Sequence, residues 1–357
     1  MDNLDLNMLP ELLLPWYREN HRCLPWRETK EPYHIWLSEI MLQQTRTETV
    51  KAYYARFLTL FPTVADLARA SQEQVLKAWE GLGYYSRARN LHRAAQAVVQ
   101  EHGGRFPDSV EGLLKLPGVG PYTAGAIASI AFGRPAPAVD GNVYRVASRY
   151  FGVRRDIGDP AAQREIRALV QAALPQDRPG DFNQAVMDLG SALCIPLRPR
   201  CDQCPLSDSC DAYAEGDADV LPIHEKKSPP RRVEVAVCLA VWEGRVLVMP
   251  RAQRMLGGLY VFWLATDVSD AQTARETLEE AGFPCRFVES LGEARHVFTH
   301  RVWEMHLMHF ALTGAPDAQA MERLGARMAA LEDLDALPFP TAMRAALEAA
   351  QGLLRRR

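Results

Sequence analysis

Two carboxylates in different surroundings could share acid–base chemistry. Glu39 lies in PYHIWLSEIMLQQT, residues 32–45, which is predicted to be helical, and its apolar neighbours would desolvate it. Burial favours the protonated acid, so such a glutamate could donate a proton near neutral pH. Helical periodicity alone favours a simpler alternative, a glutamate at the rim of an amphipathic helix. Asp140 closes an apolar, proline-bearing segment, where its carboxylate could face a site.

A glycine hairpin lies upstream of the second carboxylate. Residues 108–142 read DSVEGLLKLPGVGPYTAGAIASIAFGRPAPAVDGN. Asp108 is predicted to cap a short helix, and Pro121 suits the first position of another helix. Between them, Gly118 and Gly120 can take positive φ and leave backbone N–H groups exposed. These amides and the N-terminus of the second helix could bind a phosphate, although an ordinary corner between two helices would need the same glycines.

Four of the seven cysteines are clustered in the pattern C-x6-C-x2-C-x5-C, at Cys194, Cys201, Cys204 and Cys210. Four thiolates in one short loop can hold tetrahedral zinc or an iron–sulfur cluster. Zinc sites more often pair two C-x2-C units, and this run has one. The isolated cysteines are expected to be buried small hydrophobic residues, namely Cys23, Cys238 and Cys285.

The composition is that of an ordinary globular chain. Its 357 residues are 48% hydrophobic and 24% charged with a net charge of −3, so any face that bound nucleic acid would have to be local. Arginines are frequent between residues 145 and 200, but acids are interspersed among them. No run approaches the roughly 18 apolar residues of a membrane span. The N-terminus lacks the basic region of a signal peptide, which favours a cytoplasmic protein (nucleoid-associated if bacterial). In such a reducing setting, clustered cysteines bind metal more often than they form disulfides.

Most of the first 215 residues are predicted to be helical. Residues 216–232 have the charged, proline-bearing composition of a linker. Beyond them, the pattern predicts strands at 233–242 and 245–250, a helix at 271–281, a strand near 297–310 and a final helix after Pro340. We therefore predict a multidomain chain with an all-α domain over residues 1–215 and a smaller α/β domain over residues 233–357.

Three motifs resemble a known family. LPGVGPYTAGAI followed by VDGNV is similar to the helix-hairpin-helix and trailing aspartate of the DNA base-excision glycosylases. Together with WLSEIMLQQT and GLGYYSRARN, this segment resembles the adenine DNA glycosylases of the MutY family over most of residues 20–215. The resemblance implies a helix-hairpin-helix glycosylase domain with an iron–sulfur loop.

The resemblance also implies roles for individual residues. Glu39 matches the general acid that protonates adenine, and Asp140 matches the carboxylate that supports the cationic sugar. Asn142 could orient Asp140 or a water molecule. Gln44 and Tyr84 match residues that wedge into the duplex when the base is flipped. The adenine pocket and the phosphate-binding hairpin would include Trp26, Arg27, Leu42, Gly118 and Gly120.

Tyr122 separates two classes of glycosylase. In bifunctional enzymes of the endonuclease III type, the corresponding position is a lysine whose amine forms a Schiff base and cuts the strand. Tyrosine cannot do so, and we therefore predict a monofunctional enzyme that leaves an abasic site. The alternatives are an endonuclease III-like glycosylase for damaged pyrimidines and a non-catalytic module that binds duplex DNA.

The cysteine run matches the [4Fe–4S] loop of the same superfamily. The resemblance therefore favours an iron–sulfur cluster with a structural and DNA-positioning role. Arg198 and Arg200, in the first part of the loop, would contact DNA phosphates.

Residues 231–357 resemble the Nudix-like domain that MutY proteins append to read 8-oxoguanine. GGLYVFW and HVFTH stand where that family has similar segments. Phe298, Thr299 and His300 match its recognition loop, in which the threonine keeps the hydroxyl of the usual serine. The simpler alternative for this loop is an ordinary turn between strands.

RETLEEAGF, residues 275–283, resembles the metal-binding end of a true Nudix box, whose glutamates hold magnesium to cleave pyrophosphates. Val261 and Asp267 stand where the glycine and glutamate upstream in the box would be. We therefore predict a relic of the fold, with the glutamates on a solvated helix face at Glu276, Glu279 and Glu280. Nudix hydrolysis is the last alternative.

The complete prediction is a monofunctional glycosylase that hydrolyses the N-glycosidic bond of adenine opposite 8-oxoguanine or guanine. Its expected cofactor is a [4Fe–4S] cluster, and its expected partner is duplex DNA that contains these mispairs. We expect a monomer without membrane attachment.

Overall fold

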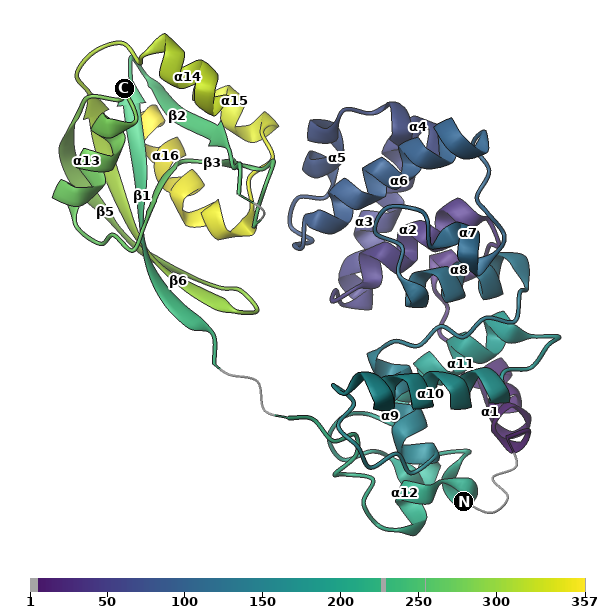
Figure 1. The fold of residues 1–357 in the computed structure, drawn as a ribbon. Helices are drawn as coiled ribbons and strands as arrows, with labels where there is room; N and C mark the ends of the chain where they lie inside the picture. Colours follow the sequence, from purple (N-terminus) through teal and green to yellow (C-terminus); the bar gives the residue numbers. More distant parts are fainter. Residues whose placement is uncertain (1–5, 226–228, 254, 357) are drawn as a thin grey trace. The chain divides into compact units, whose positions relative to one another are not determined.

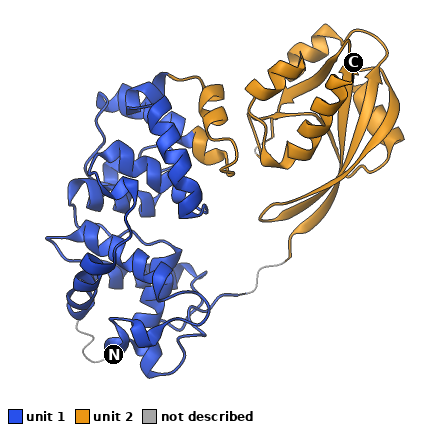
Figure 2. Cartoon of the chain, turned by 180° about the vertical axis from the view of Figure 1, so that it is seen from behind, with its two compact units in different colours: residues 1–69, 90–226 blue, residues 70–89, 227–357 orange. Residues whose placement is uncertain are grey.

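The computed structural model describes residues 6–225, 229–253 and 255–356. The chain forms two compact units, residues 1–69 with 90–226 and residues 70–89 with 227–357 (Figures 1 and 2). These limits differ from the expected boundaries, because residues 70–89 group with the C-terminal unit and the first unit extends past residue 215. Leu221, inside the expected linker, is buried, and Ile223 accepts a hydrogen bond from Ile157.

The first unit is helical over its described residues. Its helices are α1 (Met8–Asn20), α2 (Pro32–Leu42), α3 (Thr47–Leu60), α4 (Val64–Arg69), most of α6 (Ser86–His102), α7 (Val110–Leu113), α8 (Pro121–Phe132), α9 (Gly141–Tyr150), α10 (Pro160–Ala173), α11 (Pro179–Ala192) and α12 (Asp211–Ala214). The all-α prediction is thus confirmed for this unit. Helix α2 packs against α3 and α8, and α11 packs against α1, α8 and α9.

The hairpin helices begin and end close to where the sequence predicts. Helix α8 starts at Pro121 and stops at Phe132, and Gly133 follows with a φ of 64°. The predicted cap of the preceding helix is wrong. Ser109, not Asp108, accepts the capping hydrogen bond, from the N–H of Gly112, and α7 is only one turn long.

The segment that leads to Asp140 is fixed tightly against α8 and α11. A Cβ at Gly125 in α8 would lie 2.1 Å from the carbonyl oxygen of Pro137, so only glycine permits this approach. On α11, the buried amide of Asn183 accepts from the N–H of Ala138 at 3.0 Å and donates to the carbonyl of Ala136 at 2.8 Å. This segment therefore has a defined path into the site.

The second unit contains a mixed sheet. Its strands are β1 (Arg231–Trp242), β2 (Arg245–Pro250), β3 (Tyr260–Val261), β4 (Trp263–Thr266), β5 (Cys285–Val297), β6 (Arg301–Leu312) and β7 (Arg327–Ala329). Along the sheet the order is β3-β2-β1-β6-β5, while β4 pairs with β1 and β7 pairs with β2. Strand β1 runs parallel to β6, and β5 runs antiparallel to β6. The helices of this unit are α5 (Gln72–Ala78), α13 (Ala271–Glu280), α14 (Ala318–Leu324), α15 (Leu331–Ala336) and α16 (Arg344–Arg355).

The α/β prediction is confirmed, with one error in the strands. The single strand expected near 297–310 is the end of β5 and most of β6, separated by a turn at residues 298–300. The pair forms a long hairpin, and β1 pairs with β6 from Arg301 to Ala311 (Figure 1). Strand β5 is largely exposed along its length, so its sequence lacks the apolar alternation that reveals strands.

Two further expectations can be compared with the structure. Cys238 and Cys285 are buried as predicted, but Cys23 is exposed, so that prediction is wrong. Within the described ranges, no helix combines the length and the apolar character that a membrane span requires.

Candidate active site

Glu39 and Tyr122 form the centre of the site. Glu39 projects from α2 and is 6% exposed, and the hydroxyl of Tyr122, near the start of α8, donates a hydrogen bond to its Oε2. Burial raises the pKa of Glu39 to about 7. The Tyr122 hydrogen bond opposes this rise, while the nearby charge of Asp140 adds to it. A large fraction of Glu39 is therefore protonated at neutral pH, as proton donation requires.

Asp140 is held at the start of α9. Its carboxylate accepts from the N–H of Val143 at 2.8 Å and from the Asn142 amide at 3.0 Å. Burial raises the pKa of Asp140, and these two hydrogen bonds partly counteract the rise. The pKa of Tyr122 is raised mainly by its own burial, and the charges of Glu39 and Asp140 raise it further. The three groups thus share one buried site.

The orientation of Asn142 is fixed from its far side. Its Oδ1 accepts from Arg145 at 2.9 Å. The same guanidinium donates to the backbone carbonyls of Cys194 and Gly190, at 2.8 and 2.7 Å. Because Arg145 can only donate, Asn142 must present its amide hydrogens to Asp140.

A third buried carboxylate, which the sequence analysis missed, binds Arg27. Asp188 on α11 pairs with Arg27 and with Arg22, the latter at 2.7 Å. Burial alone would raise the pKa of Asp188, but the hydrogen bonds and charges of the two arginines hold it below its usual value. Trp26, in the same turn as Arg27, is buried with its ring edge-on to that of Tyr54. The Pro25–Arg27 turn is therefore anchored to α11.

Two family models match this chain. Residues 37–172 match the HhH-GPD superfamily of base excision DNA repair proteins, and residues 236–349 match the NUDIX domain. The human adenine DNA glycosylase is 35% identical over 95% of this chain and 73% of its own length. The chain belongs to the adenine DNA glycosylases. The resemblance seen in the sequence motifs is thus confirmed, as is the assignment to enzymes that hydrolyse N-glycosyl bonds.

Solved structures resemble this adenine DNA glycosylase over part of its length. A thermostable thymine-DNA glycosylase is 30% identical, with a TM-score of 0.54 over 59% of this chain and 97% of that one. A non-covalent endonuclease III–DNA complex is 25% identical, with a TM-score of 0.50 over 58% of this chain and 94% of that one.

The two hairpin glycines serve different purposes. Gly118 has a φ of 76°, and a Cβ there would lie 2.5 Å from Cβ of Asn90. Gly120 has a φ of −96°, so the expectation of positive φ is wrong at that position. A Cβ at Gly120 would meet nothing within 4 Å, which leaves open space in front of the first turn of α8.

Both residues expected to wedge into DNA have left-handed backbones. Gln44 has a φ of 58° and Tyr84 a φ of 46°, and both side chains are exposed, Tyr84 to 49%. Such conformations in non-glycine residues persist where the surrounding structure demands them, and they concentrate at functional sites. Leu42, expected in the adenine pocket, is half-buried at the end of α2.

The four clustered cysteines line one hollow in the first unit. Buried Arg149 donates to Sγ of Cys194 at 3.3 Å. Burial raises the pKa of the Cys204 thiol to about 12, and nearby Cys194, Cys210 and Cys201 add to the effect. Across the described residues, however, no three His, Cys, Asp or Glu side chains are grouped as ligands of a single metal ion. Arg198 and Arg200 are exposed, Arg200 lines the hollow, and Arg198 has a φ of 53°.

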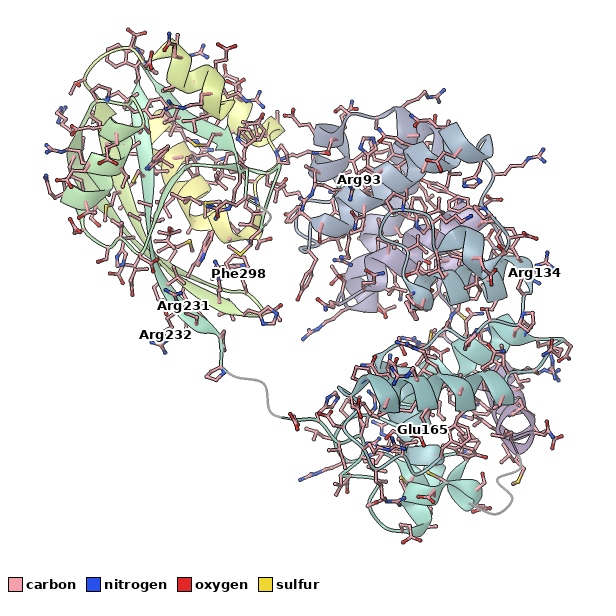
Figure 3. All side chains as sticks on the ribbon, in the orientation of Figure 1. Arg93, Arg134, Glu165, Arg231, Arg232 and Phe298 are labelled. Carbon is pink, nitrogen blue, oxygen red and sulfur yellow. The ribbon has the colours of Figure 1, made fainter. Side chains whose placement is uncertain are left out.

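The expected recognition loop is the tip of the β5–β6 hairpin. Phe298, which Figure 3 labels on this hairpin, is half-buried, whereas Thr299 and His300 are exposed. Within the second unit, the hydroxyl of Tyr84 lies 3.2 Å from that of Thr299. On α13 the three glutamates are exposed, as predicted for Glu276, Glu279 and Glu280.

Helix α11 contributes groups that sequence reasoning did not find. Besides Asp188 it supplies Met187, whose sulfur lies 4.0 Å from the Tyr122 hydroxyl, and Asn183. The sequence carried one signal of these groups. Asn183 and Asp188 lie in the apolar stripe of DFNQAVMDLG, and buried asparagine and aspartate require hydrogen-bonding partners.

Proposed function

We propose that this chain hydrolyses the N-glycosidic bond of adenine opposite 8-oxoguanine or guanine in duplex DNA and leaves an abasic site. The proposal depends chiefly on one observation, the buried Glu39 with a pKa of about 7, bonded to Tyr122 and electrostatically coupled to Asp140. Membership of the adenine DNA glycosylases and similarity to a glycosylase–DNA complex support the substrate class.

The chemistry assigns a different task to each carboxyl group. Glu39 gives its proton to a ring nitrogen of adenine, which converts a poor anionic leaving group into a neutral one. The departing base leaves an oxocarbenium-like sugar, which the ionised Asp140 stabilises. Asn142 and the N–H of Val143 keep the Asp140 carboxylate in place through their hydrogen bonds. Water then adds to the sugar and completes hydrolysis.

Tyr122 favours a monofunctional enzyme. A Schiff base requires an amine, and the hydroxyl of Tyr122 is instead engaged with Glu39. Strand cleavage at the rate of adenine release, without added base or heat, would contradict this part of the proposal.

Duplex binding would use groups around the site. The Gly118–Gly120 hairpin would receive a phosphate at the N-terminus of α8, with Arg198 and Arg200 as further phosphate contacts. Gln44 and Tyr84 would fill the space left by the flipped base, which offsets part of the lost stacking. Trp26, Arg27 and Leu42 would line the adenine pocket.

The cysteine loop would hold a [4Fe–4S] cluster. Its donor set fits such a group, because four thiols line one hollow. When bound, the cluster cross-links the loop that carries Arg198 and Arg200. Iron and acid-labile sulfide analysis of the purified protein tests this assignment, and a colourless protein with stoichiometric zinc would refute it.

Residues 1–215 would thus supply catalysis, and residues 233–357 would read 8-oxoguanine through Phe298, Thr299 and His300. The decisive test measures single-turnover base release from three duplexes, containing adenine opposite 8-oxoguanine, adenine opposite guanine, and thymine glycol. We expect adenine release, fastest opposite 8-oxoguanine, and Glu39→Gln should bind the duplex while scarcely cleaving it. Release of thymine glycol alone would instead support an endonuclease III-like function.

A further inference from the structure

The hairpin between β5 and β6 ends in a tight turn. The N–H of Phe298 donates to the carbonyl of Arg301 at 2.7 Å, which leaves Thr299 and His300 as the tip. The strands are paired as far as Val297 and Val302. Backbone pairing therefore sets the path of the hairpin, and the position of the Phe298 ring depends on the side chains that it contacts.

An aromatic stack supports the tip. The ring of Phe298 meets that of Trp303 edge-on, with centroids 5.0 Å apart and planes at 71°, and the ring of His296 lies 4.5 Å from Phe298. His296 and Trp303 are cross-strand partners. Trp303 is 1% exposed, so its indole is a fixed support for the more exposed phenylalanine.

Arg251 contacts Trp303 from outside the hairpin. It follows β2, and its guanidinium lies 5.3 Å from the Trp303 ring centroid. Its Nε donates to the carbonyl of Met255 at 3.0 Å, and one terminal nitrogen donates to Gln253 at 2.6 Å. The side chain is 9% exposed, and a cation over an indole is attracted more strongly when both are desolvated. Arg251 thus ties the loop after β2 to the aromatic stack.

We propose that Arg251 and Trp303 are positioning residues that fix Phe298, from which the Thr299–His300 tip follows, and thereby set the discrimination between 8-oxoguanine and guanine. This inference rests on the proposed function. 8-Oxoguanine presents an N–H donor and a carbonyl on the edge where guanine has an acceptor nitrogen and a C–H. One or two hydrogen bonds must carry the difference, and hydrogen bonds weaken steeply when donor and acceptor are misaligned.

The experiment compares single-turnover adenine release opposite 8-oxoguanine with release opposite guanine, for the full-length protein and its variants. Trp303→Leu and Arg251→Met should each lower the ratio of the two rates by about tenfold, the worth of one well-made hydrogen bond. Trp303→Phe should keep most of the ratio, because it retains a ring for Phe298 to contact. Trp263→Leu is the matched control, since this β4 tryptophan donates to the hydroxyl of Thr277 and lies edge-on to the ring of Phe283, outside the β5–β6 hairpin.

The ratio separates positioning from a general loss of folded protein, which would slow both reactions equally. If Trp303→Leu and Arg251→Met leave the ratio of the two rates unchanged, even while both reactions slow, the inference is overturned. If the parent protein itself shows no preference for 8-oxoguanine, the proposed lesion reading fails instead, whatever the variants do.

Discussion

Replacing Glu39 by glutamine should stabilise the protein, and more so at alkaline pH. The pKa of Glu39 is raised from 4.5 to about 7, mainly by burial. Because the folded-state pKa is raised, the associated stability is fully present below pH 4.5 and is lost as the pH rises through 7. One pKa unit corresponds to about 1.4 kcal/mol, so the raised pKa of Glu39 lowers the free energy of unfolding by about 3 kcal/mol at pH 8 and by about 1 kcal/mol at pH 5, where only the unfolded chain is ionised at this position.

Glutamine has nearly the same shape, can accept from Tyr122 and carries no charge. The difference in the free energy of unfolding between Glu39→Gln and the parent should therefore grow by about 2 kcal/mol from pH 5 to pH 8. Urea unfolding at both pH values measures it, and Glu101→Gln on the exposed face of α6 is the control, expected to show no such growth. A stability difference that is the same at both pH values would refute the burial argument, even if the variant is inactive.

Three further variants test the site. Tyr122→Phe removes a hydrogen bond that lowers the pKa of Glu39, so the alkaline limb of the rate–pH profile should move to higher pH, whereas an acidic displacement would contradict the assigned donor direction. Asp188→Asn breaks a buried ion pair with Arg27 and should lower the free energy of unfolding by about 3 kcal/mol in urea titrations, since the arginine charge is left unpaired. A loss of unfolding free energy of no more than roughly 1 kcal/mol, as for exposed ion pairs, would show that water replaces the carboxylate. Gly125→Ala places a methyl group against the backbone that leads to Asp140, and single-turnover adenine release should fall at least about tenfold while circular dichroism keeps the helical signal.

The sequence predicts the hairpin and its flanking helices because their signals are local. Proline at the start of α8 and glycine at its end act through their own backbone angles, so Pro121 and Gly133 can be interpreted without tertiary information. The cap at Ser109 was missed for a related reason. Aspartate and serine are adjacent and equally suitable, and the choice between them depends on tertiary packing.

The groups that complete the site are set by long-range contacts. Asp188 meets Arg27 across 161 positions of the chain, and no local pattern reports such a pair. Periodicity by itself also favoured an exposed Glu39, whereas α2 is buried around most of its circumference, so its one-sided pattern is weak. Resemblance to the family identified Glu39 as a candidate site residue, which periodicity did not. Neither of the two predicted the exposed strand β5.

The carboxylate of Asp140 also begins a helix, since it accepts the N–H of Val143 in the first turn of α9. Truncating this side chain therefore removes a helix cap together with a reactive group, and slow turnover in Asp140→Ala would mix a frayed helix end with lost chemistry. Asparagine caps helices about as well as aspartate, so Asp140→Asn changes the charge while leaving the architecture intact. Few residue types suit this position, because one carboxylate must meet a folding requirement and the proposed catalytic one at the same time.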